Sequence, residues 1–177
     1  MSSVSAILHI TQQIQQDLDK FVCNKKTFVN YVSPSNLYDE IITNKSLRKK
    51  TEKLFKDGHH ARSVEEAYKL LDNIVKKKAN LQNTNLTGAS LMQRAFSPNN
   101  PILKLNSGIT TSEQDEQSGY MQVFAGCMIG IRNPRAHETD WEDTEERALQ
   151  LLSFANYLIE RTELSEVQKT SVQHKVV

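Results

Sequence analysis

Three polar side chains in the segment IRNPRAHE, residues 131–138, have the chemistry to act together on a phosphate. Histidine is the side chain that ordinarily titrates near neutral pH, and this residue type at position 137 can accept a proton and return it. Arg132 is a permanent planar cation whose fork fits phosphate oxygens, and the amide of Asn133 can orient either group. This set suffices, without a metal, to assist attack of an RNA 2′-hydroxyl on the adjacent phosphate, giving a 2′,3′-cyclic phosphate. DNA lacks that hydroxyl and should resist.

Pro134 stands between these side chains and decides how they can meet. Proline inside a helix deletes one backbone hydrogen bond and clashes with the preceding turn, at about 3 kcal/mol, and it pushes the residue before it out of helical geometry. In an unbroken helix Arg132 and His137 would point about 140° apart, whereas a break at Pro134 would let the three side chains converge. A second subunit could complete the site instead. Alternatively, the arginine and histidine only satisfy the carbonyls of a helix end.

Length and composition restrict the class of protein. The chain has 177 residues, a formal net charge of +1 and 38% hydrophobic residues, and its mean hydropathy is −0.54. This length suits one domain with a sizeable core. The small net charge gives no global signal for nucleic acid, so an RNA site would need a local cluster of cations.

Targeting signals are not found in the sequence. The N-terminal stretch has no basic region before an apolar one, and no run approaches the roughly 18 apolar residues of a membrane helix. Cys23 and Cys127 do not form a C-x-x-C pair. We therefore expect a cytoplasmic protein with reduced thiols and no membrane partner.

Apolar residues spaced three and four apart predict helices, while strand-like alternation is hard to find. The expected helices cover 4–22, 36–56 (as one or two), about 59–79, 91–96, about 114–132 and 146–163. Polar loops are expected over 80–90 and 97–118. The second loop is long, and long loops suggest a functional or partner-facing segment. The predicted fold class is all-α, a single-domain helical bundle.

The last helix has a predicted start and a predicted inward face. Thr139 or Asp140 should cap it, with Glu142 and Asp143 in its first turn, where the helix dipole favours acids. The residues expected to face inward are Leu149, Leu152, Phe154, Ala155, Leu158 and Ile159.

The motif R-N-P-R-A-H resembles that of the HEPN superfamily, in which an arginine and a neighbouring polar residue precede a histidine by a few positions. The resemblance extends to three blocks whose order and spacing look like the Ymh family within HEPN. They are GHHARSVEEAYKLL (58–71), LTGASLMQRAFSPNNPILKLN (86–106) and GYMQVFAGCMIGIRNPRAHE (119–138). Many HEPN proteins are metal-independent endoribonucleases of toxin–antitoxin, abortive-infection and other antiviral systems, and their fold is a helical bundle.

This resemblance implies roles for the motif residues and boundaries for the domain. Arg132 and His137 carry over as catalytic and Asn133 as the supporting polar residue, with no cofactor. Active members dimerise so that two motifs face one cleft, which implies a homodimer acting on RNA, with an antitoxin or defence-system protein as a possible partner. The implied organisation is an N-terminal helical region (1–54), a HEPN (Ymh-like) domain (55–162) and a polar tail (163–177). The alternative is a catalytically silent HEPN module that binds RNA or a partner protein.

A local cluster of cations supplies the candidates for RNA binding. They are Lys49, Lys50, Lys53, His59, His60, Arg62 and Arg135. The competing interpretation is a solvated helix face. Neighbouring histidines in a helix point about 100° apart, and no third ligand accompanies His59 and His60, so we expect no metal.

Other residues near the motif have two readings each. Glu65 or Glu66 could hold Arg132 in place, or lie solvated on a helix surface. Trp141 and Tyr120 could stack on bases, or pack at a helix junction. The acidic segment ETDWEDTEER after His137 would repel RNA, so it either begins a helix or faces a basic partner.

Overall fold

The computed structural model describes residues 13–17, 33–138 and 140–168. Two compact units divide the chain, residues 1–33 and 34–177. In the first unit, residues 13–17 are helical, as the predicted helix over 4–22 requires, and the rest of that prediction lies outside the described residues. The second unit holds the motif and is described below.

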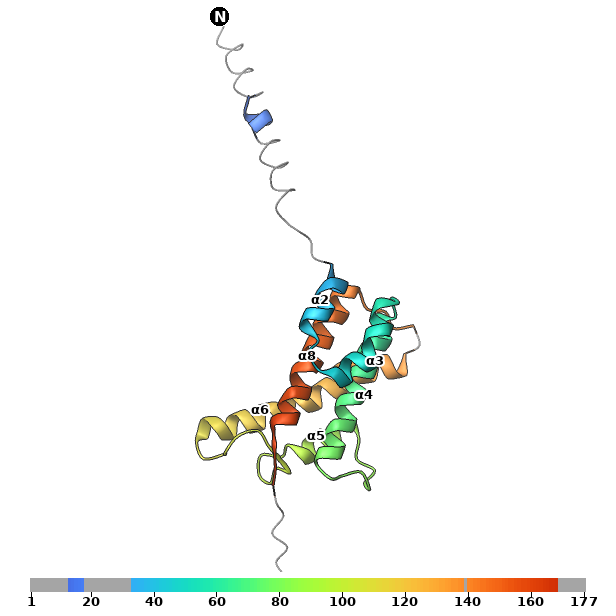
Figure 1. The fold of residues 1–177 in the computed structure, drawn as a ribbon. Coiled ribbons are helices and arrows are strands. Elements are labelled where there is room, and N and C mark those ends of the chain that lie inside the picture. The colour runs from blue at the N-terminus through green and yellow to red at the C-terminus, as the bar shows by residue number, and fades with distance from the viewer. Residues whose placement is uncertain (1–12, 18–32, 139, 169–177) are drawn as a thin grey trace, which may run out of the picture. The chain divides into compact units, whose positions relative to one another are not determined.

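Helices build almost all of the second unit, and the predicted all-α bundle is confirmed (Figure 1). The helices are α2 (Pro34–Ile41), α3 (Lys45–Lys56), α4 (His60–Lys78), α5 (Gly88–Ala95), α6 (Thr111–Cys127), the π-helical turn η1 (Met128–Arg132), α7 (Asn133–His137) and α8 (Glu145–Leu164). Helices α4 and α8 pack along each other, α3 packs on α4, α2 on α8 and α5 on α6. None of the helices in the described ranges is long and apolar enough to cross a membrane.

The apolar stripe of α4 forms the centre of the core. Val64, Ala67, Tyr68, Leu71 and Val75 are each 0% exposed, as their helical spacing predicts. The Tyr68 hydroxyl donates to the Leu151 carbonyl at 3.1 Å, which ties α4 to α8. Since burying a polar group without a partner is costly, this bond lets a large ring lie at the centre.

The inward face of α8 differs from the prediction at one residue. Leu149, Leu152, Ala155, Leu158 and Ile159 are buried, but Phe154 is 37% exposed. Two residues along a helix turn the side chain by about 200°, so a position two after Leu152 must face away from the core. The position of Phe154 around the helix, and not its apolar character, therefore determines that it is exposed.

Residues before 55 also contribute to this core. Tyr38, Ile42 and Leu47 are 0% exposed, and the Tyr38 hydroxyl shares a hydrogen bond of 2.7 Å with the Thr51 hydroxyl. The core of the second unit therefore extends from α2 through α8.

Side-chain caps decide where the helices begin. Thr110 and Glu113 form a reciprocal capping box, so α6 begins at Thr111, earlier than the expected 114. Thr144 accepts a hydrogen bond from the Arg147 N–H, so α8 begins at Glu145 and the predicted capping by Asp140 is wrong. Thr139, the other predicted cap, lies outside the described residues. Glu142 and Asp143 therefore precede α8 and lie outside its first turn, and Asp143 binds Arg135 and lies 3.5 Å from Arg147.

The loop expected over 97–118 is shorter than predicted and is anchored. Strand β1 (Leu103–Lys104) pairs antiparallel with β2 (Glu166–Val167), which gives structure to the start of the predicted polar tail. The buried amide of Gln117 donates to the carbonyls of Phe96 at 2.9 Å and Leu103 at 3.1 Å. Two-residue strands are too short to produce a visible alternation of apolar and polar residues.

Candidate functional site

The helix that carries the motif continues through Pro134 by widening, and it does not break. The Asn133 N–H donates to the Met128 carbonyl, five residues back, and this marks the π-helical turn η1. Pro134 has no N–H to donate, and in a regular α-helix its ring would clash with the Gly130 carbonyl, so a wider turn accommodates it. The expected break before Pro134 is therefore wrong, as is a non-helical Asn133, whose φ and ψ are −62° and −44°. The helix ends only at Glu138, which has extended geometry.

Asn133 lies against the guanidinium of Arg132. The Nη1 atom of Arg132 donates to the Asn133 Oδ1 at 3.2 Å, and both residues are partly exposed. An amide bonded in this way restricts the rotamers of the long arginine side chain. Asn133, the predicted supporting residue, therefore contacts Arg132, the predicted catalytic arginine.

His137 ends α7 and reaches into solvent. Its side chain is exposed and forms no hydrogen bond or ion pair with any residue that the structure describes. Because the backbone is helical from Arg132 to His137, their side chains point about 140° apart. One chain thus presents the two groups on different faces of one turn.

Asp72 on α4 is the acidic neighbour of Arg132. Its Oδ1 atom accepts a hydrogen bond from the Gly88 N–H at 2.6 Å, where α5 begins. Burial raises the pKa of the Asp72 carboxyl, and the Gly88 N–H, Arg132 and Lys76 act against that rise. Sequence reasoning missed this residue, although Asp72 is the one acid in the second half of α4.

The acids proposed earlier as partners of Arg132 bind other cations. Glu65 binds Arg62 at 2.5 Å and Lys69 at 2.7 Å, and Glu66 also contacts both. These ion pairs all lie within α4, three or four residues apart. The expectation that Glu65 or Glu66 holds Arg132 is corrected accordingly.

Arg135 is buried and structural, in place of the RNA contact that the sequence suggested. Its side chain is 2% exposed and that of Asp143 is 0% exposed. The guanidinium binds the carboxylate through two hydrogen bonds, of 2.6 and 2.7 Å, and donates a third to the Ile131 carbonyl at 2.7 Å. The Trp141 ring lies over it, with its centroid 5.4 Å from the guanidinium carbon. Arg135 therefore holds the segment after α7 against the helix.

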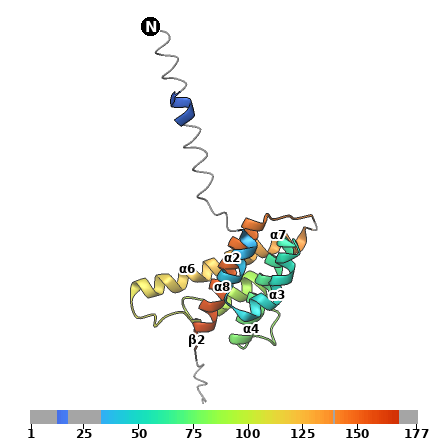
Figure 2. The same ribbon diagram turned by 45° about the horizontal axis from the view of Figure 1, so that its top comes forward.

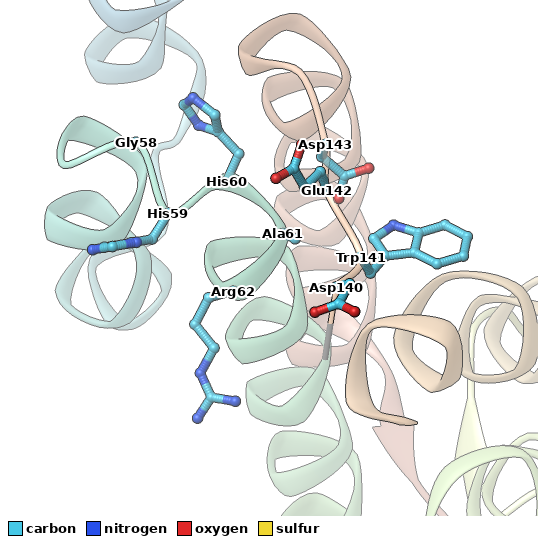
Figure 3. Close-up of a pocket in the computed structure, with 9 residues that line it drawn as sticks. All are labelled: Gly58, His59, His60, Ala61, Arg62, Asp140, Trp141, Glu142 and Asp143. Atoms are coloured by element: carbon cyan, nitrogen blue, oxygen red, sulfur yellow. The ribbon is translucent and has the colours of Figure 1, made fainter. Parts of the chain in front are cut away.

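A cavity of about 690 Å³ lies between the start of α4 and the segment that precedes α8 (Figure 3). We call it the α4 cavity, and its lining residues are Gly58, His59, His60, Ala61, Arg62, Asp140, Trp141, Glu142 and Asp143. A smaller hollow of about 270 Å³ is lined by Ala61, Arg62, Glu65, Arg135, Ala136, Glu138 and Trp141. Three residues line both, so the two spaces adjoin, and the smaller one reaches the last turn of α7.

The candidate RNA-binding residues separate into two groups. His59, His60 and Arg62 line the α4 cavity, in which the two imidazoles point in different directions (Figure 3). In contrast, Lys49, Lys50 and Lys53 lie exposed on α3 and line neither space. Among the residues described, no group of three His, Cys, Asp or Glu side chains is arranged to hold a metal.

The two aromatic residues near the motif also separate. Trp141 lines the α4 cavity and the adjoining hollow. Tyr120 packs elsewhere, with its hydroxyl hydrogen-bonded to that of Tyr157 and the Arg161 guanidinium 5.0 Å above its ring. Only Trp141 is thus placed to meet a ligand in the cavity.

Comparison with known proteins gives one match. A family model described as "Protein of unknown function (Hypoth_ymh)" matches residues 43–162, which is more than half of the chain. No curated protein and no solved structure matches the chain.

Proposed function

The chain belongs to the Hypoth_ymh family, and from this premise we propose that it is a HEPN-type, metal-independent endoribonuclease of an antiviral, abortive-infection or toxin-type system. The observation that carries the proposal is the turn at the end of the motif helix. There Arg132 is oriented by Asn133 at 3.2 Å, while five residues on, the exposed His137 is free to exchange protons with a substrate.

In the proposed reaction His137 removes the proton from an RNA 2′-hydroxyl. The 2′-oxygen forms a bond to the adjacent phosphorus, the bond from phosphorus to the 5′-oxygen breaks, and a proton is delivered to that leaving oxygen. Arg132 stabilises the negative charge that accumulates on the non-bridging oxygens. The products are a 2′,3′-cyclic phosphate and a 5′-hydroxyl.

A homodimer would combine groups that one chain holds apart. Arg132 and His137 point about 140° apart on their own helix, so a second copy that faces the same turn could supply the missing group to each site. The exposed face of α6 and η1 supports such pairing, since an added Cβ at Gly119, Gly126 or Gly130 would meet no described atom within 4 Å. Between them, Ile129 is 58% exposed.

Close approach of a second helix would explain these glycines. Glycine inside a helix costs about 1 kcal/mol relative to alanine, and nothing in the described part of this chain requires a small residue at these positions. In both ribbon views the N-terminal part of α6 projects from the other helices of its unit (Figures 1 and 2). A Gly126→Leu variant should therefore shift a dimer to a monomer in sedimentation and lower cleavage, without loss of helicity.

The decisive experiment is cleavage of total RNA and tRNA by the purified chain in EDTA. Cleavage should persist without metal, leave DNA intact, and fall by about 10²-fold or more in His137→Ala and Arg132→Ala. Arg94→Ala, which removes an exposed arginine of α5, is the matched control and should cleave normally. The proposal fails if wild type and both motif variants cut equally, or if none of them cuts.

A second candidate function is a catalytically silent HEPN module that binds RNA or a protein. It is favoured by Glu138, Asp140 and Glu142, three exposed acids near the motif that lack an ion pair with any described residue. This function predicts co-purification with the product of a neighbouring gene and no toxicity on overexpression. A growth defect that disappears in His137→Ala would rule against it.

A further inference from the structure

We infer that the α4 cavity binds a nucleobase of single-stranded RNA beside the cleaved linkage, with a preference for guanine over uracil. This inference rests on the proposed endoribonuclease function, because it names a specificity subsite for the same reaction. The argument depends on the size of the cavity, the opposite chemistry of its two walls, its tryptophan, and its position next to α7.

The cavity has the dimensions of a ligand site. Its volume of about 690 Å³ lies within the range of roughly 300 to 1,000 Å³ that small-molecule sites occupy. Such a volume accommodates one nucleotide. The exposed lysines of α3 line neither the α4 cavity nor the adjoining hollow, so towards these spaces they offer only charge.

One wall of the cavity is the start of α4, which favours electron-rich groups. His59 is the N-cap of this 19-residue helix and makes no side-chain cap hydrogen bond, and the first turn contains no acid. The free N–H groups of a first turn carry a partial positive charge. Arg62 adds a cation at the same end, although Glu65 and Glu66 partly neutralise it.

The opposite wall holds the carboxylates of Asp140, Glu142 and Asp143 (Figure 3). Asp143 forms an ion pair with Arg135, whereas Asp140 and Glu142 are exposed and form no ion pair with a described residue. A simple anion would be repelled by this wall, and a simple cation by the start of α4. A neutral planar ligand with both donors and acceptors satisfies the two walls at once.

Trp141 supplies the surface on which such a planar ligand can stack. Base–aromatic stacking contributes substantially to single-strand binding for every base. Arg135 packs on this ring at 5.4 Å, so the indole is held in place before a ligand arrives. The Nε1 atom of Trp141 and the Nδ1 atom of His60 are both buried and have no hydrogen-bond partner among the described residues. Buried polar atoms normally have partners, so two residues of the cavity lining each hold an unsatisfied polar atom just beneath its surface.

The carboxylates select among the bases. An ionised carboxylate only accepts hydrogen bonds, with two oxygens side by side. Guanine presents two adjacent donors, N1–H and the N2 amino group, which match those oxygens. Uracil presents a single N–H between two carbonyls, which a carboxylate repels. Asp140 and Glu142 therefore favour guanine and disfavour uracil.

The position of the cavity connects this base to the reaction. The adjoining hollow shares Ala61, Arg62 and Trp141 with the cavity and is also lined by Ala136 and Glu138, the residues on either side of His137. A strand whose phosphate lies at His137 can thus place a neighbouring base in the α4 cavity.

Trp141 is the only tryptophan of the chain, so its fluorescence reports directly on the cavity. Full-length His137→Ala protein, which should not cleave, is titrated with guanosine, adenosine, cytidine and uridine 5′-monophosphates. Guanosine monophosphate should quench the emission saturably and bind about tenfold or more tightly than uridine monophosphate. Asp140→Asn and Glu142→Gln should each weaken guanosine monophosphate about tenfold. Asp115→Asn, an exposed acid on α6, is the matched control and should change nothing.

Three outcomes overturn the inference. The first is that no nucleotide changes the fluorescence. The second is that all four nucleotides bind equally and that Asp140→Asn and Glu142→Gln leave their affinity unchanged. The third is that a hexa-arginine peptide quenches the fluorescence and the nucleotides do not. The last would assign the cavity to a basic protein segment. Cleavage is measured separately, so a chain that cuts RNA but ignores guanosine monophosphate refutes only the subsite. A chain that binds it but never cuts RNA refutes only the nuclease.

Discussion

The packed pair α4–α8 and the segment η1–α7 are built on opposite principles. In α4 the apolar stripe is 0% exposed and keeps helical spacing throughout. In η1–α7 the helix is widened by a π-turn, the preceding glycines face solvent, and the terminal His137 is exposed. Regular spacing therefore marks the region that stabilises this fold, and departures from it mark the region that offers free chemical groups.

Two interactions position the motif segment. Asp72 of α4 lies in the electrostatic field of Arg132, and the buried pair of Arg135 with Asp143 holds α7 next to the start of α8. The motif segment is thus positioned by the bundle even though its own geometry is irregular. The following changes test this division, in order of decreasing effect on stability.

Asp143→Ala should have the largest effect, because it leaves the Arg135 guanidinium buried without its counter-ion. Both side chains are at most 2% exposed, and breaking such a pair costs about 3–5 kcal/mol. Urea unfolding measures the loss. The double variant Arg135→Met/Asp143→Leu should regain much of the stability, since it removes both charges. Unchanged stability in Asp143→Ala would show that this pair does not hold the segment.

Leu152→Ala should lower the free energy of unfolding by about 2–5 kcal/mol, because Leu152 is 0% exposed in the core. Phe154→Ala on the same helix is the comparison, and because 37% of Phe154 is exposed it should cost less than Leu152→Ala, about 1–2 kcal/mol. Thermal or urea unfolding compares them. Equal losses would contradict the phase of α8 described above.

These two residues also show how far sequence reasoning reaches. Helical periodicity predicted α4 and the bundle because burial repeats regularly along a helix. Phe154 was wrongly predicted to be buried because it is apolar, although it lies about 200° round the helix from Leu152. The predicted start of α8 failed because Thr144 caps the helix, while Asp143 binds Arg135, eight residues earlier in the chain, and holds the preceding segment in place. An ion pair between residues of two different segments leaves no signal in the local sequence around either residue.

The candidate site shows the same limit. Asn133 beside Arg132 follows from adjacency, and the T-x-x-E spacing of Thr110 and Glu113 is a local signal of the capping box that the predicted helix start near 114 overlooked. The burial of Arg135 was not visible, because an arginine within a motif looks equally suited to a phosphate or to an internal acid. Only the packing of Trp141 and Asp143 around it distinguishes the two.

Stability should fall in alkaline solution because the core holds a protonated thiol. Burial raises the pKa of Cys127 to about 11, while an unfolded thiol ionises near pH 8.5. Between these values the unfolded chain has lost the proton and the folded chain keeps it, so the free energy of unfolding decreases by up to about 1.4 kcal/mol per pH unit. Cys127→Ala should be less stable at pH 7 but should show a shallower decline up to pH 9.5. Parallel declines in the two proteins would contradict the raised pKa.

Pro134→Ala should have the smallest effect on stability and the clearest effect on the motif. Alanine restores an N–H at position 134 and removes the ring, so a regular bond to the Gly130 carbonyl becomes available and the π-turn can relax. The gain of one hydrogen bond and the looser unfolded chain oppose each other, so stability should change by less than about 1 kcal/mol. If the π-turn relaxes to regular α-helical geometry, Arg132 rotates about the helix axis relative to α6. Its guanidinium then moves away from Asp72. Misplacement of this kind costs about 10²-fold in rate. Wild-type RNA cleavage in this variant would show that the wider turn is unnecessary for the site.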